Sequence, residues 1–561
     1  MHTRVRFIVP SLLTLAVPVL ATVDFQQCFA DIRQGLYGTT GGTDSQGNPV
    51  TIANATSITY ELCLRACGTG STPFSWPAFN QQFSAWLLPW LALTSQFPFG
   101  SRHKWENFLS AVLALGSPCL AAYSLILTVL HTKWLARRFA NIEYPNGAYA
   151  ARILNNLQQT PIMVRTDGGR LASLIVLPEN DPWWMELAEK LDDADTHTWS
   201  IATAASIAWV VIAYALTIVD ASSNIPANSE SNLSGAGSIW VWMLPVTLAY
   251  LQISPRDPDR VTDALARARE SSFVAGPNGV VRATQCALSL RPYRGSDQEN
   301  PTPIYAYARF FPFIQAVEKI ASALDNATEK FIDLQAVGGT DWVTGNGNSI
   351  DPANRTGTPE QIEEYCAPPE DAHVRGSYWG PEALSTFFIA ALAALTLQWA
   401  TTGASILLAY VTPAVGLGCA SLTYLLHGIL ATLIWGLFVL SSVAEHYATT
   451  HAGVPRVFRR VAFAAWSAVL FRRVGKLLAI LNALWIVLAF LLRFSNFYHR
   501  CRCNSDVLGL GKSAYLVLVF DGSEISVMRA AWVGGVALAV IVSGLFLGFI
   551  NLPIKPPFAS K

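Results

Sequence analysis

The chain has 561 residues, of which 52% are hydrophobic and only 14% are charged, and its mean hydropathy is positive. A set of soluble domains of this length would carry more charge, so the composition indicates a protein that has lipid as its solvent. The formal net charge is zero, which argues against the basic surface typical of nucleic-acid-binding proteins.

Residues 1–21 are typical of a secretory signal peptide. Arg4 and Arg6 precede an apolar run that ends at Leu20, and the small residue Ala21 predicts cleavage after it. Extension of the apolar run to Val23 leaves an uncleaved signal anchor as the alternative. In both cases the chain that follows begins on the exterior side.

Residues 22–82 predict a small exterior region that contains cysteines. The segment is rich in Gly, Thr, Asn and Ser and carries the sequon Asn54-Ala55-Thr56. An oxidising compartment allows disulfides here, but the number of cysteines is odd, so one needs a partner from another exterior loop or stays free. The candidates are Cys28, Cys63, Cys67, Cys419, Cys501 and Cys503.

Apolar segments predict an all-α fold, a polytopic bundle of about seven and up to nine transmembrane helices. Two segments are ambiguous: residues 83–99, which contain Pro89 and Pro98 and are either re-entrant or spanning, and residues 401–420, which glycines and Pro413 interrupt. The clear spans are residues 108–130, 201–219, 239–253, 384–400, 422–443, 477–492 and 530–550.

Basic residues beside the spans favour seven crossings. The cluster at Lys133, Arg137 and Arg138 and a second cluster before residue 477 belong in the cytoplasm. With an exterior start, each requires an odd number of preceding crossings, so residues 83–99 do not cross and the C-terminus lies inside. The rival map of nine crossings counts both ambiguous segments and places the Lys133 cluster outside.

The soluble parts are two loops and a tail. Loop 131–200 interrupts a first membrane group, residues 108–253, and the large hydrophilic loop 254–383 lies between the fourth and fifth apolar segments. A second membrane group, residues 384–550, precedes the tail 551–561. In loop 131–200, Trp184, Leu187, Ala188 and Leu191 share one helical face, which predicts an amphipathic helix on the membrane surface. Helices at residues 258–271 and 312–324 predict a soluble subdomain in the larger loop.

Sequons and intramembrane polar residues are the next candidate sites. The glycosylation candidates are Asn54, Asn232, Asn326 and Asn354; the preferred map leaves the last two inside, whereas the nine-crossing map exposes them. His427 and Asn482 are polar groups in apolar spans. Such groups either mark a functional site or form an interhelical hydrogen bond, and we favour the hydrogen bond.

A basic cluster flanks the apolar residues 461–471. On the cytoplasmic leaflet it is suited to anionic lipid headgroups, although ordinary anchoring of the topology explains it equally well. The residues are Arg456, Arg459, Arg460, Arg472, Arg473 and Lys476.

The chain shows no motif for a specific reaction. Residues 509–513 resemble a phosphate-binding loop, but Asp506 stands where the first glycine is required. His499, Cys501 and Cys503 form an incomplete set for zinc, and a disulfide is the more ordinary role. We therefore expect no catalytic, cofactor or metal site, and an enzyme is not the leading class.

Three segments resemble those of uncharacterised polytopic membrane proteins of filamentous fungi: residues 83–93 (FSAWLLPWLAL), 196–202 (THTWSIA) and 398–404 (QWATTGA). The resemblance covers most of the membrane region. It implies a fungal source and a shared helix bundle, but no activity and no site residue.

These observations predict a non-enzymatic sensor or receptor-like scaffold of the secretory pathway, with the plasma membrane as its location. The alternative is a transporter or channel for a small solute, because the interrupted segment 401–420 precedes His427 and broken helices often line a transport site. The ligand, the oligomeric state and the pairing of the cysteines stay open.

Overall fold

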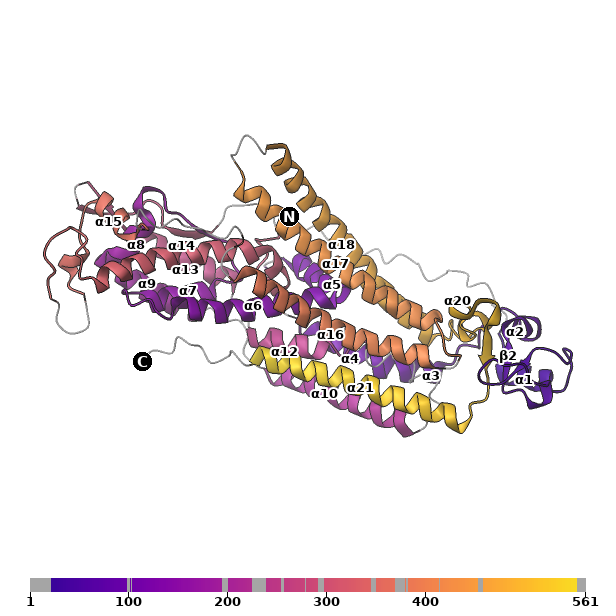
Figure 1. Cartoon of the computed structure of the whole chain (residues 1–561). Coiled ribbons are helices and arrows are strands. Elements are labelled where there is room, and N and C mark those ends of the chain that lie inside the picture. The colour runs from indigo at the N-terminus through magenta and orange to yellow at the C-terminus, as the bar shows by residue number, and fades with distance from the viewer. Residues whose placement is uncertain are drawn as a thin grey trace, which may run out of the picture.

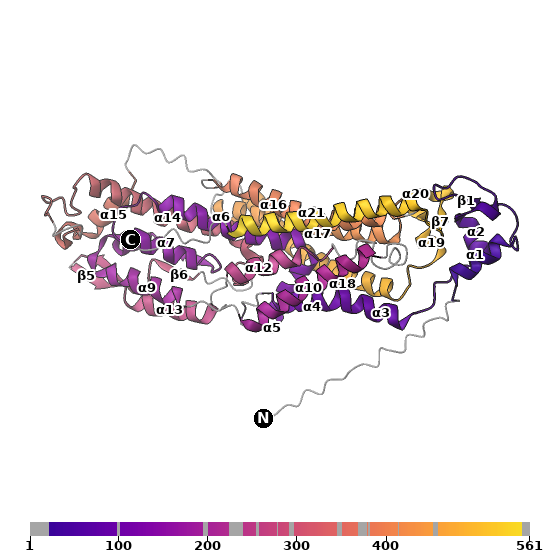
Figure 2. The same ribbon diagram turned by 90° about the horizontal axis from the view of Figure 1, so that it is seen from below.

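The computed structural model describes residues 22–97, 101, 103–193, 200–223, 239–253, 257–277, 279–290, 297–344, 350–368, 379, 382–412, 414–452 and 458–551. The predicted signal peptide, the sequon at Asn232, Arg456 and nearly all of the tail lie outside these ranges. The molecule is elongated, with a small cap at one end, a helix bundle in the middle and a helical domain at the other end (Figures 1 and 2).

The cap consists of residues 22–75 and 495–521. Its elements are α1 Phe25–Arg33, β1 Gly42–Thr43, η1 Ile52–Asn54, β2 Ser57–Thr59, α2 Tyr60–Cys67, α19 Cys501–Asn504, α20 Val507–Leu510, η8 Gly511–Ser513 and β7 Tyr515–Val517. The antiparallel sheet β1-β2-β7 pairs Ile58 with Leu516. Both side chains are buried in a core of their own, so strands distant in sequence build one small domain.

Disulfides join the two parts of the cap to each other and to the bundle. Cys28 pairs with Cys67 inside the N-terminal part, Cys63 pairs with Cys501, and Cys419 at the start of α17 pairs with Cys503. All six predicted cysteines are therefore paired. The odd cysteine of the N-terminal part finds its partner in the loop after α18.

The bundle is built from apolar helices. They are α3 Trp76–Gln82, η2 Phe83–Leu87, α4 Leu88–Ser95, α5 Lys104–Gly116, α6 Pro118–Phe139, α10 Ile201–Ser223, α12 Met243–Ile253, α16 Ala383–Val411, α17 Cys419–Thr450, α18 Phe458–Phe494 and α21 Gly522–Asn551. Among the described residues, six helices are long and apolar enough to cross a membrane. They are α6, α10, α16, α17, α18 and α21, and they indicate a membrane protein.

The predicted span 108–130 is not one helix. It divides at Ser117 into α5 and α6, because Pro118 lacks an amide hydrogen and disfavours helical geometry in the residue before it. Ser110 of α5 and Ser124 of α6 both reach residues 302–304 beside the helical domain. The two helices therefore form a hairpin whose open end faces that domain.

Two further segments differ from their predicted form. Residues 83–99 were ambiguous, and they continue the helical run that starts at α3, which passes through the π-helical turn η2 before Pro89. Residues 401–411 belong to α16, which runs unbroken through Gly403 and ends before Pro413. The prediction of a separate element at 401–420 is wrong, because a single glycine is tolerated inside a long helix.

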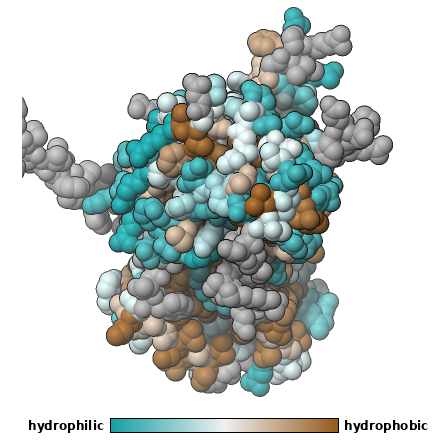
Figure 3. All heavy atoms as spheres, turned by 90° about the vertical axis from the view of Figure 1, so that its left-hand side faces the viewer, coloured by the Kyte–Doolittle hydropathy of each residue, from teal (hydrophilic) through white to brown (hydrophobic). Residues whose placement is uncertain are grey.

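The two predicted loops fold together as the helical domain, residues 140–193 and 257–366. Its elements are α7 Gly147–Asn156, β3 Ile162–Val164, η3 Asp167–Gly169, α8 Arg170–Val176, η4 Pro178–Asn180, α9 Asp181–Asp192, α13 Pro258–Glu270, β4 Phe273–Gly276, β5 Gly279–Arg282, β6 Leu288–Leu290, η5 Pro303–Tyr305, α14 Ala306–Ile332, η6 Pro352–Arg355 and α15 Pro359–Cys366. Strand β3 of the first loop pairs with β6 of the second. Its end surface is mostly hydrophilic (Figure 3).

The amphipathic helix is present as α9, but it does not lie on a membrane. Trp184 and Leu187 are buried, and the indole N–H groups of Trp183 and Trp184 donate to the carbonyl oxygens of Ala268 and Leu174 at 2.7 and 2.9 Å. The apolar face therefore packs inside the helical domain. The amphipathic pattern alone cannot distinguish a protein core from a bilayer surface.

The short strands and the many connecting segments make the fold mostly helical rather than purely so. The core of the helical domain is continuous with the core of the bundle, which joins the two parts into one packed body. Along the outside of the bundle, apolar side chains face outward, as on α10, where Trp209 is 61% and Leu216 is 64% exposed. Such surfaces suit contact with lipid.

Candidate functional site

The tip of the α5–α6 hairpin lies deep in the bundle, where its backbone groups need partners. The α5 carbonyl of Gly116 accepts a hydrogen bond from Asn482 Nδ2 at 2.8 Å. The amide of Cys119 donates to Gln398 Oε1 at 3.0 Å, and Ser117 Oγ donates to the carbonyl of Ala431 at 2.7 Å. Polar side chains thus satisfy backbone groups that a turn between two helices exposes.

His427 and Asn482, the predicted intramembrane polar residues, contact each other in this place. His427 Nδ1 lies 3.1 Å from Asn482 Oδ1, and Asn482 Nδ2 also reaches the His427 carbonyl at 3.2 Å. The prediction of an interhelical hydrogen bond is confirmed. Gln398 was missed, although a single amide in the apolar run of α16 is the signal that would have found it.

A cavity of about 150 Å³ lies where the cap meets the bundle. Its walls come from three parts of the chain: Phe25 of α1, the ends of α16 and α17 around Thr412 and Cys419, and the segment from the end of α18 to β7. Chain segments distant in sequence therefore meet around one space, and the disulfide Cys419–Cys503 lies in its wall.

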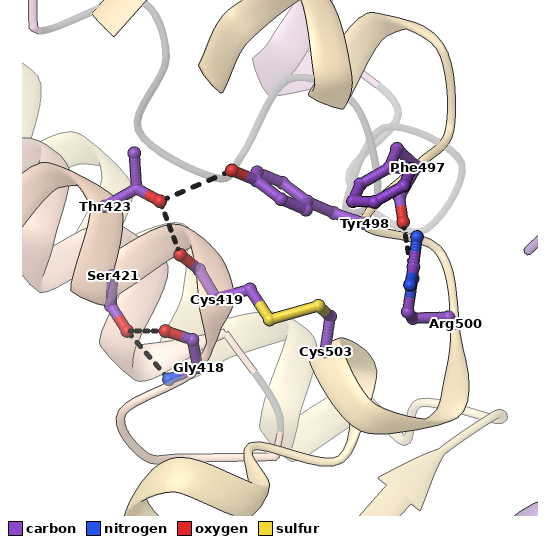
Figure 4. The surroundings of a disulfide bond; sticks show 8 residues. All are labelled: Gly418, Cys419, Ser421, Thr423, Phe497, Tyr498, Arg500 and Cys503. Carbon is purple, nitrogen blue, oxygen red and sulfur yellow. Dashed lines mark hydrogen bonds between the residues drawn. A yellow bond between two sulfur atoms is a disulfide. The ribbon is translucent and has the colours of Figure 1, made fainter. Parts of the chain in front are cut away.

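The first turn of α17 is tied firmly into this wall (Figure 4). Besides the disulfide, the Gly418 amide donates to Ser421 Oγ at 2.8 Å, and Thr423 Oγ1 lies 3.4 Å from the Tyr498 hydroxyl. Cys419 accepts from the Thr423 hydroxyl through its carbonyl oxygen at 2.8 Å. A movement of the loop at residues 498–503 must therefore move the end of α17 as well.

Asp506 is the acidic residue of the cavity wall. It is only 8% exposed and adopts a positive φ of 47°, and a Cβ atom added at Gly418 would lie 1.9 Å from its Oδ1 atom. Within the described ranges, no side-chain hydrogen bond or ion pair reaches its carboxyl group. Burial accordingly raises the pKa of Asp506 to about 8.

Arg493 lines the same cavity from the end of α18. Its side chain is buried, and Nη1 donates to the Tyr424 hydroxyl at 2.7 Å. A guanidinium group stays charged in proteins. The cavity therefore combines a permanent cation and a buried carboxyl group, which come from different elements of the fold.

A second cavity, of about 220 Å³, lies between α14 and α17 beside the helical domain and is lined mainly by polar side chains such as Gln315 and Glu445. Next to it, Arg472 pairs with Glu445 at 3.2 Å and Lys476 pairs with Asp297. Two members of the predicted lipid-binding cluster are thus paired with protein carboxylates. Arg459, Arg460 and Arg473 are exposed on α18.

The sequons differ in accessibility. Asn54 is exposed at the end of η1 in the cap. Asn326 is half-buried and donates to the Cys366 carbonyl at 2.9 Å, and Asn354 is buried and exchanges two hydrogen bonds with the backbone of Val343. Both of the latter lie in the helical domain, at the opposite end from the cap.

The predicted metal-ligand candidates are engaged elsewhere. Cys501 and Cys503 belong to two different disulfides, and the sulfur atoms of Cys63, Cys67 and Cys501, which lie within 4.8 Å of one another, are all in disulfides. A disulfide sulfur is not the thiolate that binds a metal ion. This cluster is therefore a covalent staple.

Comparison of the chain with protein-family models, with curated protein sequences and with solved structures finds no match, so the resemblance to fungal membrane proteins stays a prediction and the site has to be interpreted from its own geometry.

Proposed function

We propose that the chain crosses the membrane seven times, with the cap outside and the helical domain in the cytoplasm. The three disulfides of the cap support an oxidising exterior. Lys133, Arg137 and Arg138 lie at the helical-domain end of α6, where the positive-inside rule expects them. The crossings in this arrangement are residues 76–97, 201–223, 239–253 and the helices α16, α17, α18 and α21.

In this topology the α5–α6 hairpin enters from the cytoplasmic side and returns. Residues 76–97 then take the crossing expected of residues 108–130. Phe97, at the far end of that run, packs against Tyr250 at the helical-domain end of α12, with 6.1 Å between ring centroids, whereas Phe79 near its start packs against Phe494 beside the cap. The parity of the predicted map is preserved although its first element differs.

The function that this arrangement supports best is that of a receptor-like sensor. The observation that carries the proposal is that the wall of the cap cavity contains the ends of α16, α17 and α18, and two of these helices contact the helical domain at their other ends. Ser442 of α17 donates to the Tyr307 carbonyl at 2.8 Å, and Lys476 of α18 pairs with Asp297. Occupation of the cavity would therefore bias helices that reach the cytoplasmic domain.

The coupling can be tested without knowing the ligand, by cutting one covalent connection. The double variant C419S/C503S releases the end of α17 from the cap, whereas C28S/C67S removes a disulfide within the cap away from the cavity. In lipid nanodiscs, hydrogen exchange of residues 306–316 should become faster in C419S/C503S and stay unchanged in C28S/C67S. Equal exchange of these residues in wild type and C419S/C503S would refute the coupling.

Transport is the second candidate, because the α5–α6 hairpin places two helix ends inside the bundle, as broken helices do in many transporters. Against this, the groups at the tip bond to protein side chains, which favours a fixed structural role. Flux of amino acids and of small ions into proteoliposomes should equal that into empty liposomes. Flux that the His427→Ala variant abolishes would instead favour a transporter.

A further inference from the structure

Two buried groups of opposite character face the cap cavity, and together they restrict what can bind there. Asp506 reaches the cavity from the loop before α20, and Arg493 reaches it from the end of α18. The two residues form no ion pair with each other, since their side chains are not within 4.0 Å among the described pairs. Each therefore presents its own charge to the space between them.

Asp506 favours a positively charged group. Its carboxyl group is 8% exposed and, in the part of the chain that the structure describes, receives no hydrogen bond from another side chain. A buried carboxylate without a partner is costly, and a neighbouring cation removes that cost. An ammonium group in the cavity would supply both the charge and the hydrogen-bond donors.

Arg493 favours a carboxylate. The guanidinium group presents several N–H donors in a planar fork that matches the two oxygens of a carboxylate, and its contact with Tyr424 uses Nη1. It would repel a ligand that is only a cation. In the same way, an ionised Asp506 would repel a ligand that is only an anion.

The size and the remaining walls suit a small molecule. The cavity of about 150 Å³ has room for roughly ten water molecules, a volume comparable to that of a small amino acid. Phe25, Tyr498 and Phe520 add aromatic surface, which can contact an apolar side chain or the face of an ammonium group.

We propose that this cavity is a binding site for a small zwitterion, namely a free α-amino acid, whose ammonium group contacts Asp506 and whose carboxylate contacts Arg493. The proposal rests on the sensor function above and names its ligand class. A divalent cation is a poorer match, because it requires several oxygen ligands and Asp506 is the one carboxylate among the described residues of the lining, which also includes Arg493.

The test is isothermal titration calorimetry of the full chain in nanodiscs. The probes are glycine, alanine, serine and valine, with ethanolamine, acetate and calcium chloride as partial or rival ligands. At least one amino acid should bind, and ethanolamine and acetate should bind about tenfold more weakly or not at all, because each loses one of the two ion pairs. No heat with any amino acid, or binding of calcium alone, would overturn the proposal.

Variants locate the site. Asp506→Asn and Arg493→Gln should each weaken amino-acid binding about tenfold or more, whereas Asp521→Asn, an exposed change in the same loop, should leave it unchanged. Because Arg493 also bonds to Tyr424, Arg493→Lys serves as a second variant that keeps the charge but loses the planar fork, and it too should bind more weakly at an unchanged melting temperature. Wild-type affinity in Asp506→Asn would refute the assignment.

The outcomes also separate this inference from the sensor proposal. Amino-acid binding that depends on Asp506 but leaves hydrogen exchange of residues 306–316 unchanged would support the site and contradict the coupling. Faster exchange in C419S/C503S, with no amino acid bound to wild type, would support the coupling and contradict the ligand class.

Discussion

The side-chain amide of Asn482 in α18 donates to the backbone carbonyl of Gly116 at 2.8 Å, at the tip of a helical hairpin inside the bundle. Gly116 is also in close contact with α18, since a Cβ atom there would lie 2.2 Å from the carbonyl oxygen of Ala479. One helix therefore both supplies the polar partner for the tip and leaves no space for a side chain on it.

Replacement of Gly116 should unfold this region. In Gly116→Ala the added methyl group meets a backbone atom that cannot rotate away, so we expect a loss of about 3 kcal/mol or more in the free energy of unfolding. Thermal unfolding of the detergent-solubilised protein measures the effect. Gly436→Ala in α17 is the matched control, because nothing lies within 4 Å of the added atom, and its melting temperature should equal or exceed that of wild type. Equal stability of the two variants would contradict the close approach of α5 and α18.

Asn482→Leu should destabilise the protein more mildly. The change keeps the approximate volume but removes the bonds to Gly116 and His427, and interhelical hydrogen bonds in membranes contribute about 1 kcal/mol. The same unfolding assay should show a lower melting temperature, and a cysteine introduced at Ser117 should become more reactive to a membrane-permeant thiol reagent. Wild-type reactivity at that position would argue against a role for Asn482 in holding the tip.

Glycosylation in microsomes should separate the two ends of the molecule. With each sequon tested as the sole acceptor, Asn54 should be modified, because it is exposed in the cap. Asn326 and Asn354 should stay unmodified, because they lie in the helical domain, which we assign to the cytoplasm. A glycan on either of these two asparagines would refute the proposed topology.

Asp506 should make the stability of the protein fall as the pH rises. Its pKa is about 8 in the folded protein and has an ordinary value of 3.8, so between these values the folded state holds a proton that the unfolded state has lost. The unfolded state then binds fewer protons, and the free energy of unfolding decreases by up to about 1.4 kcal/mol per pH unit. The loss is complete above pH 8 and absent below pH 4.

The comparison that isolates this effect uses Asp506→Asn, in which no proton is exchanged at this position. His499 lines the same cavity and Tyr515 packs nearby, so both titrate in the variant as in wild type. The difference in melting temperature between variant and wild type should increase from pH 5 to pH 8. A difference that stays constant over this range would mean that the carboxyl group of Asp506 is not raised in pKa.

The sequence by itself determined the membrane class, the apolar spans of α10, α16, α17, α18 and α21, and the set of cysteines available for disulfides. These features depend on composition and on runs of neighbouring residues, which the chain displays directly. It also indicated that His427 and Asn482 needed partners, since a polar side chain in an apolar span rarely stays unsatisfied.

Only the tertiary structure decided which groups meet. The pairing of Cys63 with Cys501 joins segments 438 residues apart, and no local pattern encodes such a contact. The break at Ser117 was hidden because both arms of the hairpin are apolar, and α9 has an apolar face that suits a bilayer surface as well as a protein core. The cap cavity is likewise a product of packing, because Asp506 and Arg493 face one space only after the loop following α18 has folded against the end of α17.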